Sequence, residues 1–144
     1  MIKRATKEDA AVLASLAIQM WADNDPEGLT ESFRELIGNA DAACFLKYID
    51  KSPIGFAQCQ LRHDYVEGTE TSPVGYLEGV YVKETDRRQG IARKLIAACE
   101  KWAKEQGCTE FASDCELTNT DSQAFHQAIG FEEANRLVAY VRKI

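Results

Sequence analysis

The residues best suited to chemistry form a basic turn with a glycine, Arg87–Ala92 (RRQGIA). The turn lies between a strand-like run, Tyr76–Val82, and a helix-like run, Ile91–Gln106. Unpaired N–H groups in the first turn of a helix point toward an anion, and the helix dipole adds to the attraction. Gly90 lets the backbone approach the anion, and the small Ala92 leaves the first helical turn uncrowded. The turn therefore predicts a phosphate-binding site, although a basic turn before a helix is more often only a solvated surface.

The spacing within this turn separates it from other phosphate-binding motifs. No Gly-Lys-Ser/Thr follows, as in a Walker loop, and the G-x-G-x-x-G fingerprint of dinucleotide-binding folds is absent. The turn matches Arg/Gln-x-x-Gly-x-Gly/Ala, and in this it resembles the pyrophosphate-binding signature of the GNAT superfamily of N-acetyltransferases. The resemblance implies acetyl-CoA as co-substrate, and no metal is expected. The expected coenzyme-binding residues are Val80, Tyr81, Val82, Arg87, Arg88, Gln89, Gly90, Ile91, Ala92, Arg93 and Asn119.

Composition limits the class of protein. A chain of 144 residues with 45% hydrophobic residues has room for one domain with a real core, which we expect over residues 1–144. Its apolar runs are too short for a membrane span, and its start lacks a signal-peptide core, so no membrane partner is expected. The net charge of −6 argues against a nucleic-acid partner. It suits a cationic small molecule, although an acidic surface more often serves only solubility.

The cysteines indicate the redox environment. Their number is odd, no two form a CxxC pair, and they are Cys44, Cys59, Cys99, Cys108 and Cys115. This pattern is typical of reduced thiols in the cytoplasm, and not of a disulfide framework or a zinc site.

Hydrophobic periodicity predicts helices that alternate with strands. A Thr6–Asp9 cap begins a first helix with Val12, Leu13, Leu16 and Met20 on one face. The other expected helices are Thr30–Ile37, Ile91–Gln106 and Ser122–Ile129. The expected strands are Ile2–Arg4, Ala42–Ile49, Ile54–Arg62, Val74–Val82, Glu110–Cys115, Phe131–Glu133 and Leu137–Arg142. This order predicts an α/β fold with a mixed, centrally parallel sheet covered on both faces, and it resembles the GNAT fold from end to end.

Two acidic residues stand among apolar neighbours on strands expected to be adjacent and parallel. Glu78 is predicted to share a strand face with Tyr76, Val80 and Val82, and Asp114 stands at the end of the next strand. Ligands bind where parallel strands of such a sheet part, so both carboxylates are expected to face one cleft. The alternative is that each is satisfied by a backbone or arginine partner and has no chemical role.

Gly79 predicts a β-bulge directly after Glu78. A bulge would leave the backbone groups of Val80 and Val82 free to pair with an extended pantetheine arm. An N–H group near Val80 is then expected to polarise the thioester oxygen.

Further motifs narrow the resemblance to one subgroup of the aminoglycoside 6′-N-acetyltransferases. They are Arg62-His63-Asp64-Tyr65-Val66, Ser72-Pro73, Leu77-Glu78-Gly79, Ala112-Ser113-Asp114 and His126–Glu133. The subgroup implies that Trp21, Tyr65, Glu78 and Asp114 surround the aminoglycoside and that Asn119 lies near the coenzyme. Carboxylates would attract the ammonium groups and aromatic rings would cover the sugar faces. Ordinary packing is the alternative for Trp21 and Tyr65.

Two positions depart from the resembling pattern. The usual acid after Gly130 is Asn135 here, which can bind an ammonium but brings no charge. Many GNAT enzymes carry a tyrosine, the proton donor to the departing thiolate, where this chain has His126. The identity of that donor and the range of acceptors therefore stay open.

The implied reaction is direct transfer of acetyl from acetyl-CoA to the 6′-amine, with Glu78 as the first candidate base and Asp114 as the second. Rival functions are acetylation of a polyamine or a protein N-terminus, and a non-catalytic acyl-CoA sensor. The resemblance also implies a homodimer, in which the last strands pair with or cross to a second copy.

Overall fold

A mixed five-stranded sheet forms the centre of the computed structural model, which describes residues 1–144. The strand order is β1-β2-β3-β4-β5; neighbours are antiparallel except β4 and β5, which are parallel. The strands are β1 (Ile2–Arg4), β2 (Ala42–Ile49), β3 (Ser52–Arg62), β4 (Val74–Val82) and β5 (Phe111–Ala112). The mixed sheet and its parallel pair confirm the predicted fold class, but the pair lies at the edge of the sheet and not at its centre.

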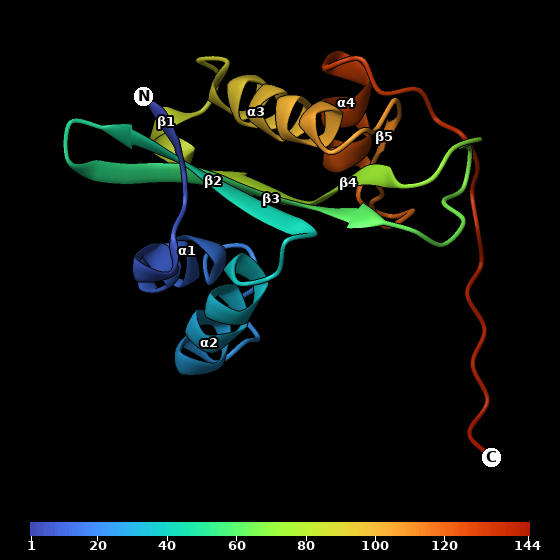
Figure 1. Ribbon diagram of the computed structural model, residues 1–144, viewed down its shortest axis with the longest axis horizontal. Coiled ribbons are helices and arrows are strands. Elements are labelled where there is room, and N and C mark those ends of the chain that lie inside the picture. Colours follow the sequence, from blue (N-terminus) through green and yellow to red (C-terminus); the bar gives the residue numbers. More distant parts are fainter.

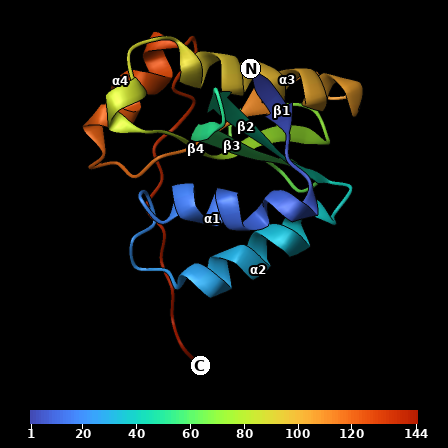
Figure 2. The same ribbon diagram turned by 90° about the vertical axis from the view of Figure 1, so that its left-hand side faces the viewer.

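Helices cover both faces of this sheet (Figure 1). The helices α1 (Ala10–Ala17) and α2 (Pro26–Ile37) lie below it, and α3 (Ile91–Glu105) and α4 (Thr120–Ala128) lie above it (Figure 2). Short 3₁₀ turns, Lys7–Asp9 and Glu84–Asp86, precede α1 and α3. No helix is long and apolar enough to cross a membrane.

The two layers enclose separate cores because the sheet buries both faces. Under α3, the apolar face of the helix packs on β2, β3 and β4 through residues such as Leu95, Cys99 and Leu77. Between the sheet and the helices α1 and α2, Leu13 and Phe33 pack around Phe56, which is 0% exposed.

Helix α2 begins four residues before the predicted start at Thr30. The side chain of Asp25 accepts a hydrogen bond from the N–H of Gly28 at 2.9 Å, and Pro26 occupies the first helical turn. An aspartate cap followed by proline starts a helix because both satisfy or remove unpaired N–H groups. The predicted start of the helix is therefore wrong by four residues.

The C-terminal strands are the largest difference from the sequence prediction. Strand β5 keeps only Phe111–Ala112 of the predicted 110–115, and residues 131–144 form no strand. Residues 132–144 are exposed, and the chain ends as an extended tail that points away from the body of the molecule (Figure 1). Leu137 and Tyr140 are 70% and 91% exposed there. The pattern predicted strands from local propensity, but a strand needs a neighbour to pair with, and no other strand of this chain lies beside the tail.

Candidate active site

The strands β4 and β5 part after a single short ladder. Their last paired residues are Tyr76 and Ala112, so the edge of β4 from Leu77 to Val82 has no strand beside it. On the other side of β4, the N–H of Lys83 donates to the carbonyl of Ile54 at 2.8 Å. Antiparallel ladders alternate between bonded and non-bonded pairs. The backbone groups of residues 80 and 82 therefore point to the open edge.

One of these outward groups already has a partner within the chain. The carbonyl of Val82 accepts a hydrogen bond from Nε of Arg87 at 2.8 Å. The N–H of Val82 and both backbone groups of Val80 keep the open edge available to an extended ligand. Tyr81 turns its backbone to β3 instead, and its ring packs against the core below the sheet.

The predicted bulge lies within β4. Gln58 pairs with Gly79 and Cys59 pairs with Leu77, so Glu78 is the extra residue. An extra residue reverses the alternation of faces. Val80 and Val82 consequently pack in the core under α3, whereas Glu78 lies on the other face. The predicted common face of Glu78 with Val80 and Val82 is therefore wrong, and its common face with Tyr76 is right.

The basic turn presents backbone donors at the start of α3. Arg88 and Gly90 have φ angles of +67° and +76°, so both lie in the left-handed region. The N–H groups of residues 88 to 93 donate to no acceptor in the protein. Ile91, which is 5% exposed, anchors the turn in the core. Successive free N–H groups in such a turn make a concave site for an anion.

The side chains of the turn have different surroundings. Arg88 and Gln89 are exposed, and Arg87 is tied to Val82 as described. Nη2 of Arg93 donates to the carbonyl of Ala128 at 3.1 Å, at the end of α4. Arg93 thus links α3 to α4, a contact that the sequence alone did not predict.

Both candidate carboxylates have partners within the protein. Nε and Nη2 of Arg62 donate to Oε1 of Glu78 at 3.2 and 2.8 Å. The hydroxyl of Tyr76 donates to Oδ2 of Asp114. The guanidinium of Arg62 also lies 3.4 Å from the centre of the Tyr76 ring. Arg62 and Tyr76 therefore join the two acids, a role that was missed at the sequence level.

Burial gives this cluster its electrostatic character. The Tyr76 residue is 6% exposed, and the side chain of Glu78 is 21% exposed. Burial, reinforced by the neighbouring carboxylate of Asp114, raises the pKa of the Tyr76 phenol above its ordinary value. Tyr76 therefore remains a hydrogen-bond donor across the neutral range.

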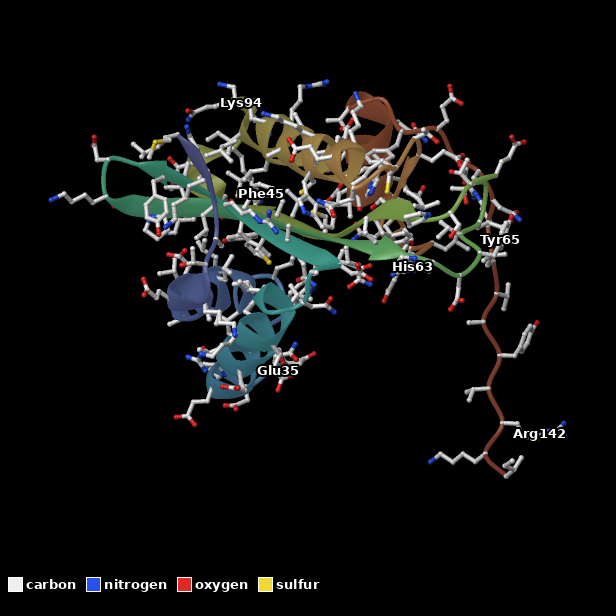
Figure 3. The ribbon with its side chains drawn as sticks, viewed as in Figure 1. Glu35, Phe45, His63, Tyr65, Lys94 and Arg142 are labelled. Atoms are coloured by element: carbon white, nitrogen blue, oxygen red, sulfur yellow. The ribbon has the colours of Figure 1, made fainter.

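Aromatic residues border the cluster to different degrees. The indole of Trp21 lies over Gly79, where an added Cβ would come within 2.9 Å of Cζ2 of the ring. Its other contact is edge-on to Phe56, with ring centres 6.2 Å apart. Trp21 thus combines a packing contact with a position over Gly79, the residue that follows Glu78. Tyr65 is 75% exposed, on the loop after β3 (Figure 3).

The tail contacts the loop that carries Tyr65. Nδ2 of Asn135 donates to Oε1 of Glu67 at 2.7 Å, and Ala134 lies against Gly68. The amide at position 135 therefore lies beside a carboxylate on the neighbouring loop. Farther along the tail, Arg142 extends away from the body of the molecule (Figure 3).

His126 has a partner on each ring nitrogen. Nδ1 lies 2.7 Å from the carbonyl of Ser122, and Nε2 lies 2.8 Å from the hydroxyl of Ser113. A carbonyl can only accept, so Nδ1 carries the proton and Nε2 of the neutral ring accepts from Ser113. Ser113 directly follows Ala112, the last paired residue of β5, at the point where the strands part. Asn119 caps α4, and its Oδ1 accepts from the N–H of Ser122 at 3.1 Å.

Metal ligation and thiol chemistry have little support in the structure. No group of three or more His, Cys, Asp or Glu side chains is placed to hold a metal ion. Burial raises the pKa of the Cys44 thiol to about 12, and all cysteines are free. A cavity of about 400 Å³ lies away from the cluster, between α3 and strands β1 and β2, where Figure 3 labels Phe45 and Lys94.

Known proteins resemble this chain over almost its whole length. Residues 11–131 match the family model described as the acetyltransferase (GNAT) family. Aminoglycoside N(6′)-acetyltransferase type 1 of Stenotrophomonas maltophilia is 44% identical over 141 residues, which are 96% of this chain and 90% of that protein.

Two solved structures resemble this fold closely. AAC(6′)-Iy in complex with the bisubstrate analogue CoA-S-monomethyl-acetylneamine has a TM-score of 0.95 at 37% identity, covering 100% of this chain and 98% of that one. The aminoglycoside antibiotic 6′-N-acetyltransferase AAC(6′)-Ih of Acinetobacter baumannii has a TM-score of 0.94 at 39% identity, with coverage of 100% and 98%. The matched region therefore spans the residues of the basic turn and of the carboxylate cluster.

Proposed function

The chain belongs to the acetyltransferase (GNAT) family, and we propose that it is an aminoglycoside 6′-N-acetyltransferase that confers resistance to these antibiotics. It would transfer acetyl from acetyl-CoA directly to the 6′-amine. One observation carries the proposal. The parallel strands β4 and β5 separate, and this part of the fold brings together a turn that can bind an anion and a pair of carboxylates. The similar proteins named above bear this activity in their names.

The donor half of the proposed site consists mainly of backbone groups. The N–H groups of residues 88 to 93 fit a pyrophosphate, and the free edge at Val80 and Val82 fits the amides of a pantetheine arm. The N–H of Val80 is our candidate for polarising the thioester oxygen. Asn119, whose Nδ2 is unused in the cap, is the candidate for a further coenzyme contact.

The acceptor half consists of side chains. Glu78 and Asp114 would attract ammonium groups, and Trp21 and Tyr65 would cover the apolar faces of the sugar. Asn135 would act together with the neighbouring Glu67, whose carboxylate supplies the charge that the asparagine lacks.

Proton transfer is the chemical problem that these residues must solve. An alkylammonium with a pKa of about 10.4 costs about 4–5 kcal/mol to deprotonate at pH 7. Glu78 is the proposed base, directly or through a water, and Asp114 is the second candidate. Holding the free amine in attack geometry supplies roughly 7–11 kcal/mol.

The sulfur of coenzyme A needs a proton when the carbon–sulfur bond breaks. Ser113 and His126 stand where the strands part, and they are our candidates for this step. Glu78 takes the first proton, from the ammonium. After the free amine attacks, its nitrogen passes a second proton through Ser113 to His126, and His126 gives that proton to the departing thiolate. No covalent enzyme intermediate is required, and the buried cysteines take no part.

The proposal also covers the extent of the domain, the oligomeric state and the cellular location. The acetyltransferase domain is proposed to extend over residues 1–144. The exposed apolar side chains of residues 137–141 favour a homodimer in which the tail pairs with a second copy. The free thiols favour the cytoplasm.

A matched pair of aminoglycosides tests the activity. One compound carries a 6′-amine and the other a 6′-hydroxyl, and release of coenzyme A thiol is followed with both. We expect release only with the amine. Equal release with both compounds, or release only with polyamines or peptides, would refute the proposal.

A further inference from the structure

Each carboxylate of the acceptor half uses one oxygen within the protein and leaves the other free. Oε1 of Glu78 accepts both hydrogen bonds from Arg62, at 3.2 and 2.8 Å. Oδ2 of Asp114 accepts the hydroxyl of Tyr76. Oε2 and Oδ1 have no hydrogen-bond partner in the protein. The same division at two acids from different elements indicates a shared arrangement.

Arg62 and Tyr76 form the link between these acids. The guanidinium lies 3.4 Å from the centre of the Tyr76 ring, so it is stacked on the ring while it holds Glu78. The phenol at the end of that ring holds Asp114. Three segments, β3, β4 and the stretch after β5, are thereby joined through four side chains.

The arrangement is firm because its centre is buried. The Tyr76 residue is 6% exposed and packs with Val66 and Val74, which fixes the ring that the guanidinium covers. Arg62 has a side chain 38% exposed, so it is held by its contacts on one side and open to solvent on the other.

We propose that Arg62 and Tyr76 are positioning residues of the acceptor site: each holds one oxygen of a carboxylate, and together they direct Oε2 of Glu78 and Oδ1 of Asp114 at the ammonium groups of the substrate. This rests on the proposed function. One guanidinium against two carboxylates leaves a single net negative charge. That charge is enough to attract a polycation, and its pull weakens when acetylation removes the charge of the bound amine.

Conservative substitutions separate the two arms of the arrangement. Arg62→Lys keeps the charge but loses the forked bond and the stacking, and Tyr76→Phe keeps the ring but loses the bond to Asp114. We expect Arg62→Lys to lower kcat about tenfold, because Glu78 loses its orientation. Tyr76→Phe should raise the KM for the aminoglycoside about threefold to tenfold, because only Asp114 is released. The KM for acetyl-CoA should not change in either variant.

The matched control is Arg34→Lys, since Arg34 forms an exposed pair with Glu31 on α2 at 2.5 Å. It should behave as the unchanged protein. If Arg62→Lys has the same kinetics as Arg34→Lys, the proposal is overturned. It is also overturned if the variants lose equal activity with every amine and the KM for acetyl-CoA rises as much as the KM for the aminoglycoside.

A crystal structure of each variant gives a readout that needs no activity. We expect Glu78 to change its side-chain orientation in Arg62→Lys, and Asp114 to do so in Tyr76→Phe. Unchanged orientations would overturn the positioning role even if the protein acetylated no aminoglycoside. An unchanged protein that binds acetyl-CoA yet acetylates no aminoglycoside would instead refute the proposed function.

Discussion

The donor and acceptor halves of the proposed site are built in opposite ways. Apart from Asn119, the donor half lies within residues 80 to 93, and it presents backbone groups of the β4 edge and of the turn that follows. The acceptor half joins side chains from distant parts of the chain: Arg62 and Glu78 are 16 residues apart, and Tyr76 and Asp114 are 38 apart.

This difference predicts how each half responds to mutation. Backbone groups survive most side-chain changes, so the donor half should depend on the conformation of the turn. The acceptor half should depend on individual side chains, because each carboxylate is held by one partner residue.

The largest effect is expected in the acceptor half, from Glu78→Gln. The variant should lower kcat/KM for the aminoglycoside about 100- to 1,000-fold at pH 7, because the amine loses its base. The loss should shrink toward pH 10, where the amine is increasingly free. Steady-state rates over this range measure it.

Glu31→Gln, on the exposed face of α2, is the control and should leave the rate unchanged. A loss from Glu78→Gln that is the same at every pH would assign the residue to binding alone.

A smaller effect is expected in the donor half, from Gly90→Ala. Gly90 has a φ of +76°, a conformation that costs alanine about 1–2 kcal/mol of free energy. In the free protein the turn should relax, and coenzyme binding must restore it. The KM for acetyl-CoA should therefore rise about 5- to 30-fold, and the KM for the aminoglycoside should not change.

Gly107 provides the matched control for this substitution. It follows α3 with a φ of +94°, and at both glycines an added Cβ would meet nothing within 4 Å. Gly107→Ala should lower the melting temperature by about as much as Gly90→Ala does, and it should leave the KM for acetyl-CoA unchanged. Equal effects of both variants on that KM would remove the special role of the turn.

The smallest effect is expected from Arg88→Gln. Arg88 is exposed, so loss of its charge should raise the KM for acetyl-CoA only about two- to fivefold. The difference should fade at high salt, where exposed charges are screened. An increase beyond about thirtyfold would mean that side-chain charge, and not the backbone, binds the pyrophosphate.

The same contrast explains what the sequence could predict. The turn and the bulge at Glu78 were predictable because glycine marks both within a few residues. The start of α2 was predicted wrongly, although Asp25-Pro26 is a local signal that marks it.

The link through Arg62 and Tyr76 was not predictable, because it depends on strand register. Tyr76 pairs with Gln60 across the ladder, and the bulge then decides which face Glu78 takes. No local pattern carries this information.

The predictions of a longer β5 and of strands in the tail are wrong for a related reason. The backbone carbonyl of Glu110 still accepts from the N–H of Gly75 on β4 at 3.1 Å, and its Oε1 accepts from the N–H groups of Glu70 and Thr71 at 2.9 and 2.8 Å. The pairing with β4 ends at Ala112, so residues 113–115 have no strand beside them. The tail has the propensity of a strand but no partner in this chain.

The position of the new amide bond tests the account most directly. Acetyl-CoA labelled with ¹³C in the acetyl carbonyl is incubated with an aminoglycoside that carries several amines, and the product is analysed by NMR. We expect one acetyl group on the 6′-nitrogen for each coenzyme A thiol released. An acetyl group on a different nitrogen, or thiol release without an amide, would contradict it.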